Sequence, residues 1–390
     1  MAEKKRGQND GSIRQRKDGT WEARFSTGKY DEKGNAIRKS IYAKSVTEVR
    51  KELKKALAQV QEGEYIIEKD ITFGSWMKEW LVTYKKNEIR KTTYDSHYTS
   101  VKAYIMNESI GAIKLKDLRN DHIQKAYNNM TQSLSAATIK RLHAVVKCGL
   151  AQAVKNEIIK KNPAVDVNLP KMEKTEITIL THEEQKKFLK ALKDERLKAP
   201  FIFALQSGLR LGELLGLKWD DIDFKNATIN IKRSVKRAKT NFDENSNGIM
   251  SELLIQEPKT SAGRRTVPLM PTAITILQEH EKDQLKEKQL AGLLYSRERW
   301  VFCTELGAVI EPRNFLRKFK KILDMNGLPS INFHALRHTF VSRMIESGVN
   351  IKTVSEIIGH TKTSLTMDIY GHVLPEQKQD AVKKINHLFK

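Results

Sequence analysis

Residues 207–224 read SGLRLGELLGLKWDDIDF and are the most informative stretch of this 390-residue chain. Glu213 follows Arg210 by three residues, so a guanidinium and a carboxylate lie one helical turn apart. Leu217, Trp219 and Ile222 supply an apolar framework next to this pair. The stretch therefore predicts a structural element that presents one arginine, and the segments that follow indicate the role of that arginine.

Three later segments carry further reactive side chains: EPKTSAGRRTVPL at 257–269, HALRHTF at 334–340 and IIGHTKTSLTMDIYGH at 357–372. His334 and Arg337 are spaced i, i+3, which places both on one face of a helix. His360 follows a glycine, and Tyr370 lies ten residues further on. Two arginines, a lysine and two imidazoles can surround one phosphate while a nearby tyrosine attacks it. Such a set permits cleavage of a DNA strand without metal or ATP.

Lys259 is the lysine best placed for this set, because it lies just before the turn of a hairpin predicted over residues 253–269. Three other lysines near the strands remain alternatives: Lys232, Lys236 and Lys239. His372 is a minor candidate for the same phosphate. His334 and His338 have the i, i+4 spacing of a metal pair, but HALRH lacks the glutamate and no third ligand is evident. We therefore expect no metal and no cofactor.

The order of GLRLGE, PKT, HALRHTF, GH and a tyrosine closely resembles the tyrosine recombinase (phage integrase) family, at motif level over about the C-terminal half. The resemblance implies a site-specific recombinase that cuts and rejoins DNA through a covalent 3′-phosphotyrosine. It assigns Tyr370 as the nucleophile, and Arg210 and Arg337 as clamps that bind the phosphate. It assigns Lys259 as the acid for the departing 5′-oxygen and His334 to proton transfer. It gives His360 a hydrogen bond to the phosphate, and Glu213 the role of orienting catalytic side chains. A phenol with a pKa of about 10 needs such help at neutral pH.

The charge of the chain suits a nucleic acid. Lys and Arg number 70 against 47 Asp and Glu, which gives a formal net charge of +23. Neutralised phosphates release counterions and favour binding, although composition alone also fits a soluble basic or ribosome-associated protein. No long apolar run and no apolar N-terminal segment is present, so we expect a cytoplasmic protein with no membrane contact. Cys148 and Cys303 lie in unrelated segments and are expected to be reduced thiols.

Residues 1–66 predict a three-stranded sheet followed by one helix, with Ser45 and Glu48 forming a capping box. The segment resembles the arm-type DNA-binding domain of integrases from conjugative transposons of Gram-positive bacteria. A sheet of this kind can read bases in a major groove. We expect Phe25 in the core, whereas the pattern is compatible with either the core or the DNA-binding face for Trp21. The candidates for that face are Arg14, Arg16, Trp21, Arg24 and Lys29.

Residues 71–170 predict a helical bundle that resembles the SAM-like core-binding domain of the family. Its tryptophans and tyrosines recur at helical spacing, which favours a place in the core over base stacking. The basic residues left for phosphate contacts include Lys91, Lys140, Arg141 and Lys147, with Lys102 and Lys155 beside them. An acidic linker precedes this domain at 62–70, and a hinge follows it at 171–178.

Residues 176–390 predict a mixed α+β catalytic domain, so the fold class is multidomain and mainly α with small sheets. Residues 239–251 are polar and longer than a hairpin needs. A helix with an apolar stripe is predicted after Pro375, and it can dock either on its own domain or on a neighbouring protomer.

Two other functions compete with the recombinase: a non-catalytic DNA-binding regulator and a type IB topoisomerase. The regulator does not need Tyr370 or Lys259, and the topoisomerase does not explain a sheet domain ahead of a helical one. The expected partners are double-stranded DNA at core and arm sites, three further copies of the chain in a tetramer on DNA, and an accessory excision or DNA-bending protein. Free in solution, the chain is expected to be a monomer.

Overall fold

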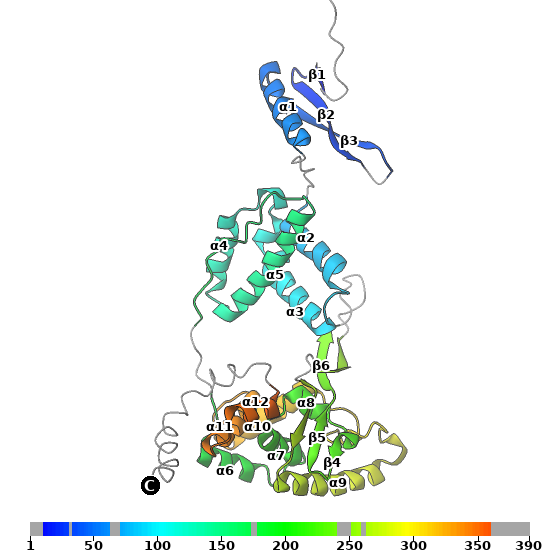
Figure 1. Ribbon diagram of the computed structural model, residues 1–390, viewed down its shortest axis with the longest axis vertical. Helices are drawn as coiled ribbons and strands as arrows, with labels where there is room; N and C mark the ends of the chain where they lie inside the picture. Colours follow the sequence, from blue (N-terminus) through cyan, green and yellow to red (C-terminus); the bar gives the residue numbers. More distant parts are fainter. Residues whose placement is uncertain are drawn as a thin grey trace, which may run out of the picture. The chain divides into compact units, whose positions relative to one another are not determined.

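The computed structural model describes residues 11–30, 33–62, 71–172, 178–239, 251–258 and 263–359. The chain divides into two compact units, Met1–Met172 and Glu173–Lys390 (Figure 1). Four residues considered for the site lie outside the described ranges: Lys259, His360, Tyr370 and His372. The same holds for the loop at 240–250 and for the predicted C-terminal helix. The described chain is mainly helical with small sheets, as the sequence predicts.

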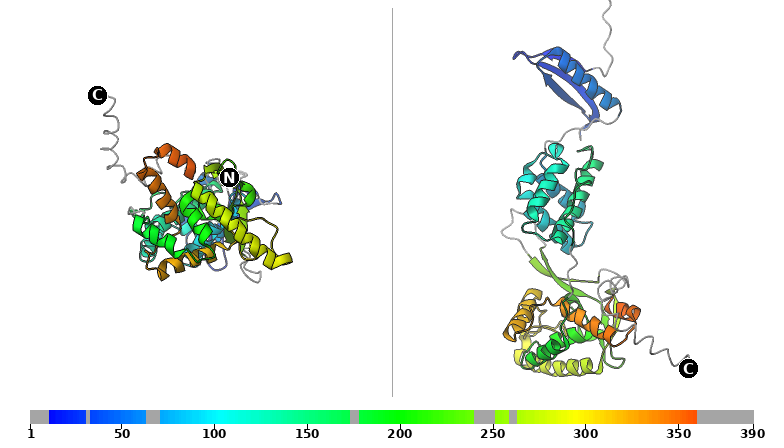
Figure 2. Two further views of the ribbon diagram at one scale, coloured as in Figure 1. Left: turned by 90° about the horizontal axis from the view of Figure 1, so that it is seen from below. Right: turned by 90° about the vertical axis from the view of Figure 1, so that its left-hand side faces the viewer.

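The N-terminal sheet is antiparallel in the order β1 (Ser12–Gln15), β2 (Trp21–Tyr30) and β3 (Ala36–Ala43), and α1 (Val46–Gln61) lies along one face of it (Figures 1 and 2). Alternation along β2 turns Ala23 and Phe25 toward Val49 and Leu53 of α1. The Ser45 side chain accepts the Glu48 N–H at 3.2 Å and begins the helix. The predicted sheet, the helix and the core position of Phe25 are confirmed.

The helical bundle contains α2 (Phe73–Trp80), α3 (Lys91–Val101), α4 (Asn120–Met130) and α5 (Ala136–Lys155). Trp76 and Trp80 are almost fully buried, and the Trp76 indole donates to the Gly149 carbonyl at 2.9 Å. A Cβ at Gly149 would come within 2.6 Å of the Met77 sulfur, so α2 and α5 are in close contact. The expectation that these tryptophans pack in the core is confirmed.

The second unit holds two small sheets. One has the order β4 (Ile222–Asp223), β5 (Thr228–Ile231) and β8 (Arg265–Pro268); the other pairs β6 (Ser234–Lys239) with β7 (Ser251–Gln256). The hairpin predicted over 253–269 is therefore wrong, because β7 and β8 belong to different sheets. Buried Val267 of β8 is paired with buried Ile229 of β5, and this apolar contact draws β8 into the core.

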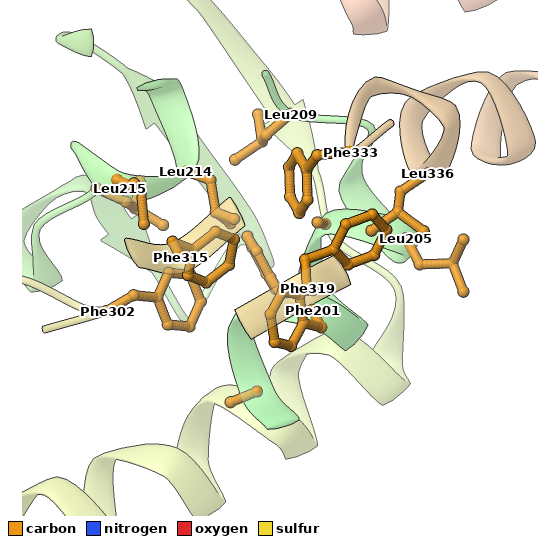
Figure 3. Close-up of a cluster of buried hydrophobic side chains, with 14 of the residues drawn as sticks. Phe201, Leu205, Leu209, Leu214, Leu215, Phe302, Phe315, Phe319, Phe333 and Leu336 are labelled. Carbon is orange, nitrogen blue, oxygen red and sulfur yellow. The ribbon is translucent and has the colours of Figure 1, made fainter. Parts of the chain in front are cut away.

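The helices of this unit are α6 (His182–Ala191), α7 (Lys198–Ser207), α8 (Leu211–Leu215), α9 (Pro271–Ala291), α10 (Pro312–Met325), α11 (His334–Glu346) and α12 (Ile351–Ile358). Their core combines phenylalanine and leucine side chains (Figure 3). The Phe201 and Phe315 rings stack at 4.6 Å, and Phe333 meets Phe315 and Phe319 edge to face. This cluster joins α7 and α10 to the start of α11. It therefore fixes α7, which precedes Arg210, and α11, which carries His334 and Arg337.

Candidate active site

Arg210 begins α8, and its position is set by the turn that ends α7. Gly208 is left-handed with φ of 62°, and a Cβ there would come within 2.5 Å of the Phe340 ring. Glu213 then accepts the Arg210 backbone N–H at 3.1 Å and its guanidinium at 2.8 Å. One carboxylate thus fixes both the main chain and the side chain of Arg210. The side chain keeps 39% of its surface exposed.

Arg337 lies on α11 and is buried. Its two terminal nitrogens donate to the carbonyls of Gly208 at 2.7 Å and Ile358 at 2.6 Å. Arg337 therefore ties the turn before Arg210 to the end of α12. This contact joins parts of the chain that are far apart in sequence.

His334 is exposed at the first turn of α11, three residues before Arg337. The rings of His334 and His338 meet edge to face at 4.7 Å. Burial, followed by the charge of Arg337, lowers the pKa of His338 below its ordinary value. His338 is consequently a neutral neighbour of His334 at physiological pH.

Three guanidinium groups meet the C-terminal carbonyls of α12. Arg265 donates to Ile357 at 2.7 Å, Arg337 to Ile358 at 2.6 Å and Arg210 to Gly359 at 3.2 Å. Helix ends leave such carbonyls without partners inside the helix and carry partial negative charge. The next residue in the sequence is His360. The three arginines therefore hold the segment from which the predicted histidine continues.

Arg265 was not anticipated from the sequence. It forms an ion pair with Glu213 at 3.0 Å, with side chains only 7% and 5% exposed. Burial alone would raise the pKa of the Glu213 carboxyl, but the hydrogen bond and charge of Arg265, and then those of Arg210, hold it below its ordinary value. The available signal was its spacing in β8: Arg265 lies two residues before buried Val267 and therefore on the same face of the strand.

The structure brings together Arg210, Glu213 and Arg337, and it places His334 on the same helix as Arg337. Of the alternative lysines, Lys232 forms an ion pair with buried Asp221 at 3.3 Å. Lys232 also lines a hollow of about 670 Å³ to which residues of both sheets contribute; the other basic groups in its lining are Arg233, Arg264 and Arg265. Among the described residues, no group of three or more His, Cys, Asp or Glu side chains could hold a metal ion.

The candidate DNA-binding residues of the N-terminal sheet divide between its two faces. Arg24 is exposed on the face away from α1, and Arg14 is 71% exposed on the same face, paired with Glu22. The Arg16 guanidinium lies over the Tyr42 ring at 5.3 Å. Trp21 was offered for this face, but it packs against the hydrophobic cluster under α1. That placement is corrected, because alternation puts Trp21 on the side of Ala23 and Phe25.

The remaining basic candidates lie on three elements. Lys29 is near the end of β2, within an irregular stretch of its pairing with β3. Lys91 is exposed at the start of α3, and Lys140 is half-buried on α5. Arg141 and Lys147 are exposed on α5. No helix in the described ranges is long and apolar enough to cross a membrane.

Comparison with known proteins gives the family. Residues 178–377 match the model of the phage integrase family, and residues 72–131 match that of the phage integrase N-terminal SAM-like domain. A tyrosine recombinase XerC-like protein of Caldanaerobacter subterraneus subsp. tengcongensis is 38% identical over 373 residues, which cover 92% of this chain and 94% of the relative. The chain belongs to the phage integrase family. It is a tyrosine recombinase, so the two competing functions are set aside.

Relatives of this recombinase include enzymes of mobile elements. The ICEBs1 integrase of Bacillus subtilis is 26% identical over 75% of this chain and 78% of its own. The transposase from transposon Tn916 of Enterococcus faecalis is 26% identical over 71% of this chain and 68% of its own. These similarities support the prediction of an integrase related to those of Gram-positive conjugative transposons.

Solved structures share the fold. The Tn1549 transposon integrase in complex with transposon right end DNA has a TM-score of 0.68 at 20% identity, covering 81% of this chain and 100% of its own. A lambda integrase tetramer bound to a Holliday junction has a TM-score of 0.57 at 17% identity, covering 93% and 96%. The predicted fold class is confirmed.

Proposed function

We propose that this recombinase cleaves DNA by attack of the Tyr370 oxygen on a phosphodiester, with Arg210 and Arg337 stabilising the charge that develops on the phosphate. The phosphorus–tyrosine bond forms as the bond to the 5′-oxygen breaks, and Lys259 supplies the proton for that oxygen. A 5′-hydroxyl from the other duplex then attacks the 3′-phosphotyrosine and releases the phenol. No bond energy is lost to water, so the strand can be rejoined.

The observation that carries this proposal is the arrangement of Arg210. Its bonds to Glu213 and Gly359 use three of its donor groups, one of them the backbone N–H, while 39% of the side chain remains exposed. A planar fork that never deprotonates suits the non-bridging oxygens of a phosphate. His334, exposed one turn before Arg337, is the group we assign to proton transfer at the nucleophile, and His360 to a phosphate hydrogen bond.

DNA binding outside the active site is assigned to two parts of the first unit. We assign the open face of the N-terminal sheet, with Arg14 and Arg24, to arm-type sites and the exposed basic residues of the helical bundle to core sites. Two modules joined by a linker raise the local concentration of the second site once the first has bound. The enzyme acts on DNA in the cytoplasm as a tetramer assembled from monomers, and an accessory excision or DNA-bending protein assists it.

Replacement of Tyr370 by phenylalanine tests the chemical step. Tyr370→Phe removes only the hydroxyl, so the variant should bind nicked core-site DNA with unchanged affinity and form no covalent adduct. The adduct is measured on denaturing gels, and the affinity by titration of labelled DNA. An adduct that persists in the variant would remove Tyr370 from this role.

A further inference from the structure

Arg265 contacts the candidate site through a carboxylate that it shares with Arg210. Its NH2 group donates to Glu213 Oε2 at 3.0 Å and its NH1 group to Glu213 Oε1 at 3.3 Å. Its Nε donates to the Ile357 carbonyl at 2.7 Å, and NH1 also approaches the Gly263 carbonyl at 3.4 Å. The side chain is only 7% exposed, so it is enclosed by protein rather than presented at the surface.

Both oxygens of Glu213 are shared. Oε1 accepts from Arg210 NH1 at 2.8 Å and Oε2 from the Arg210 backbone N–H at 3.1 Å, in addition to the two bonds from Arg265. The three side chains together carry one net positive charge, because one carboxylate faces two guanidinium groups. Without Arg265, the charge of Glu213 would be balanced by Arg210 alone. The pair would then present no net charge to a phosphate.

We propose that Arg265 is a positioning residue for strand cleavage: it neutralises Glu213 so that the charge of Arg210 remains available to the scissile phosphate. Its bond to Ile357 also fixes the end of α12, two residues before Gly359, which accepts from Arg210. This role rests on the proposed function of Arg210. Arg265 touches neither DNA nor the reacting atoms in this proposal.

The neighbouring arginine shows that the role depends on position rather than on basic character. Arg264 is 60% exposed and pairs with Glu257, whereas Arg265 faces inward from the start of β8. A merely structural role for the buried ion pair is the competing explanation. The two explanations differ in whether the cleavage rate follows stability when both members of the pair are neutralised.

Charge compensation predicts a rescue. Arg265→Gln should slow covalent-adduct formation on nicked core-site DNA at least about tenfold, because it weakens Arg210, and a donor that acts on the transition state is typically worth more than that. Adding Glu213→Gln removes the charge that Arg265 had balanced, so the double variant should cleave faster than Arg265→Gln alone. Equilibrium affinity for the core site should stay within about twofold in each variant. A purely structural pair predicts instead that the rate follows thermal stability in every variant, so a rescue of rate without a matching recovery of the melting temperature is the result that charge compensation requires.

A double-mutant cycle of Arg210 and Arg265 tests whether Arg265 acts through Arg210. In an Arg210→Ala background, Arg265→Gln should cause no further loss of rate, because residues that act on one another are not additive. Arg196→Gln is the matched control. Arg196 also makes two bonds to one carboxylate, Glu287, and one to a backbone carbonyl, that of Cys303. This control should cleave at the wild-type rate.

The outcomes separate the two proposals. Wild-type cleavage by Arg265→Gln, the absence of rescue, or additive losses with Arg210→Ala would each overturn the role of Arg265. If Arg265→Gln does not fold, the doubly neutral variant decides the matter, because it leaves no unpaired buried carboxylate; cleavage as slow as that of Arg210→Ala would then contradict the proposal. An adduct formed by Tyr370→Phe would instead overturn the proposed function, whatever Arg265 does.

Discussion

At the scale of single residues, the candidate site is organised around the Glu213 carboxylate, which accepts from both Arg210 and Arg265. Glu213 is 5% exposed yet ionised, because Arg265 and Arg210 outweigh the effect of burial on its pKa. A buried charge is tolerated only when it is paired and hydrogen-bonded. The position of Arg210 therefore depends on Glu213, which accepts from both its backbone and its side chain.

The pKa of Glu213 makes the local stability depend on pH. Its folded pKa lies below the ordinary value of 4.5, so the ionised carboxylate stabilises the fold fully above that value and the effect is lost as the pH falls through the folded pKa. Glu213→Gln should lower the free energy of local opening by about 1–3 kcal/mol at neutral pH. The difference from wild type should shrink in acid.

Hydrogen exchange of the α8 and α12 amides measures this difference at each pH. Glu257→Gln is a suitable control, since Glu257 is 71% exposed in its pair with Arg264. A difference between Glu213→Gln and wild type that stayed constant from neutral to acid pH would contradict the assignment of the stabilisation to ionised Glu213.

The sequence predicts single residues well where their partners are close along the chain. Arg210 with Glu213 is a local spacing, and the structure joins them as that spacing implies. Arg265 was missed because its carboxylate lies 52 residues earlier and on another element. Trp21 was ambiguous for a related reason: alternation defines two faces of a strand, but only the packing of α1 decides which face is the core.

At the scale of elements, the site is built where three helix ends meet. The left-handed turn at Gly208 ends α7, α8 begins at Arg210, and α12 ends at Gly359, which is also left-handed. Helix ends supply carbonyls without intrahelical partners, and the arginines satisfy them. α7 is buried on nearly all sides and shows little periodicity, but the helix that carries His334 and Arg337 could be predicted from their spacing. The pairing of β7 with β6 could not, because strand pairing depends on contacts distant in sequence.

Gly208→Ala tests the turn that positions Arg210. An alanine with φ of 62° costs about 1–2 kcal/mol, and its Cβ would also displace the Phe340 ring. The shift should move both Arg210 and the Gly208 carbonyl that binds Arg337, so cleavage should slow by about tenfold or more. The adduct-formation rate at saturating DNA is the measurement.

Gly292→Ala is the matched control for this variant. Gly292 also has a positive φ, of 54°, but no atom lies within 4 Å of the position that its Cβ would occupy. It should therefore lose stability without losing the rate of cleavage. Equal losses of rate in the two variants would show that backbone strain in general, rather than the placement of Arg210, limits the reaction.

At the scale of the whole molecule, the recombinase combines an N-terminal sheet, a helical bundle and a catalytic unit. The order of these parts could be predicted from changes in composition and periodicity along the chain. Deleting residues 1–66 should leave core-site cleavage unchanged, because the residues of the candidate site all lie in the second unit. The same deletion should abolish high-affinity binding to arm-type DNA and reduce the dependence of that binding on salt.

Titrations of both DNA types across a range of salt concentrations check this prediction. Arg24→Ala in the full chain is the companion variant, since Arg24 is exposed on the open face of the sheet and the substitution leaves the α1 core intact. Unchanged arm affinity and an unchanged salt slope after the deletion would show that the N-terminal sheet is not the arm-binding module.

The central claim is that Tyr370 becomes covalently attached to a phosphate held by Arg210 and Arg337. The most direct measurement is peptide mapping by mass spectrometry of the adduct formed with nicked core-site DNA. We predict a single modified peptide that carries a 3′-phosphonucleotide on Tyr370, and none from the Tyr370→Phe variant. A nucleotide attached to any other residue would contradict the account.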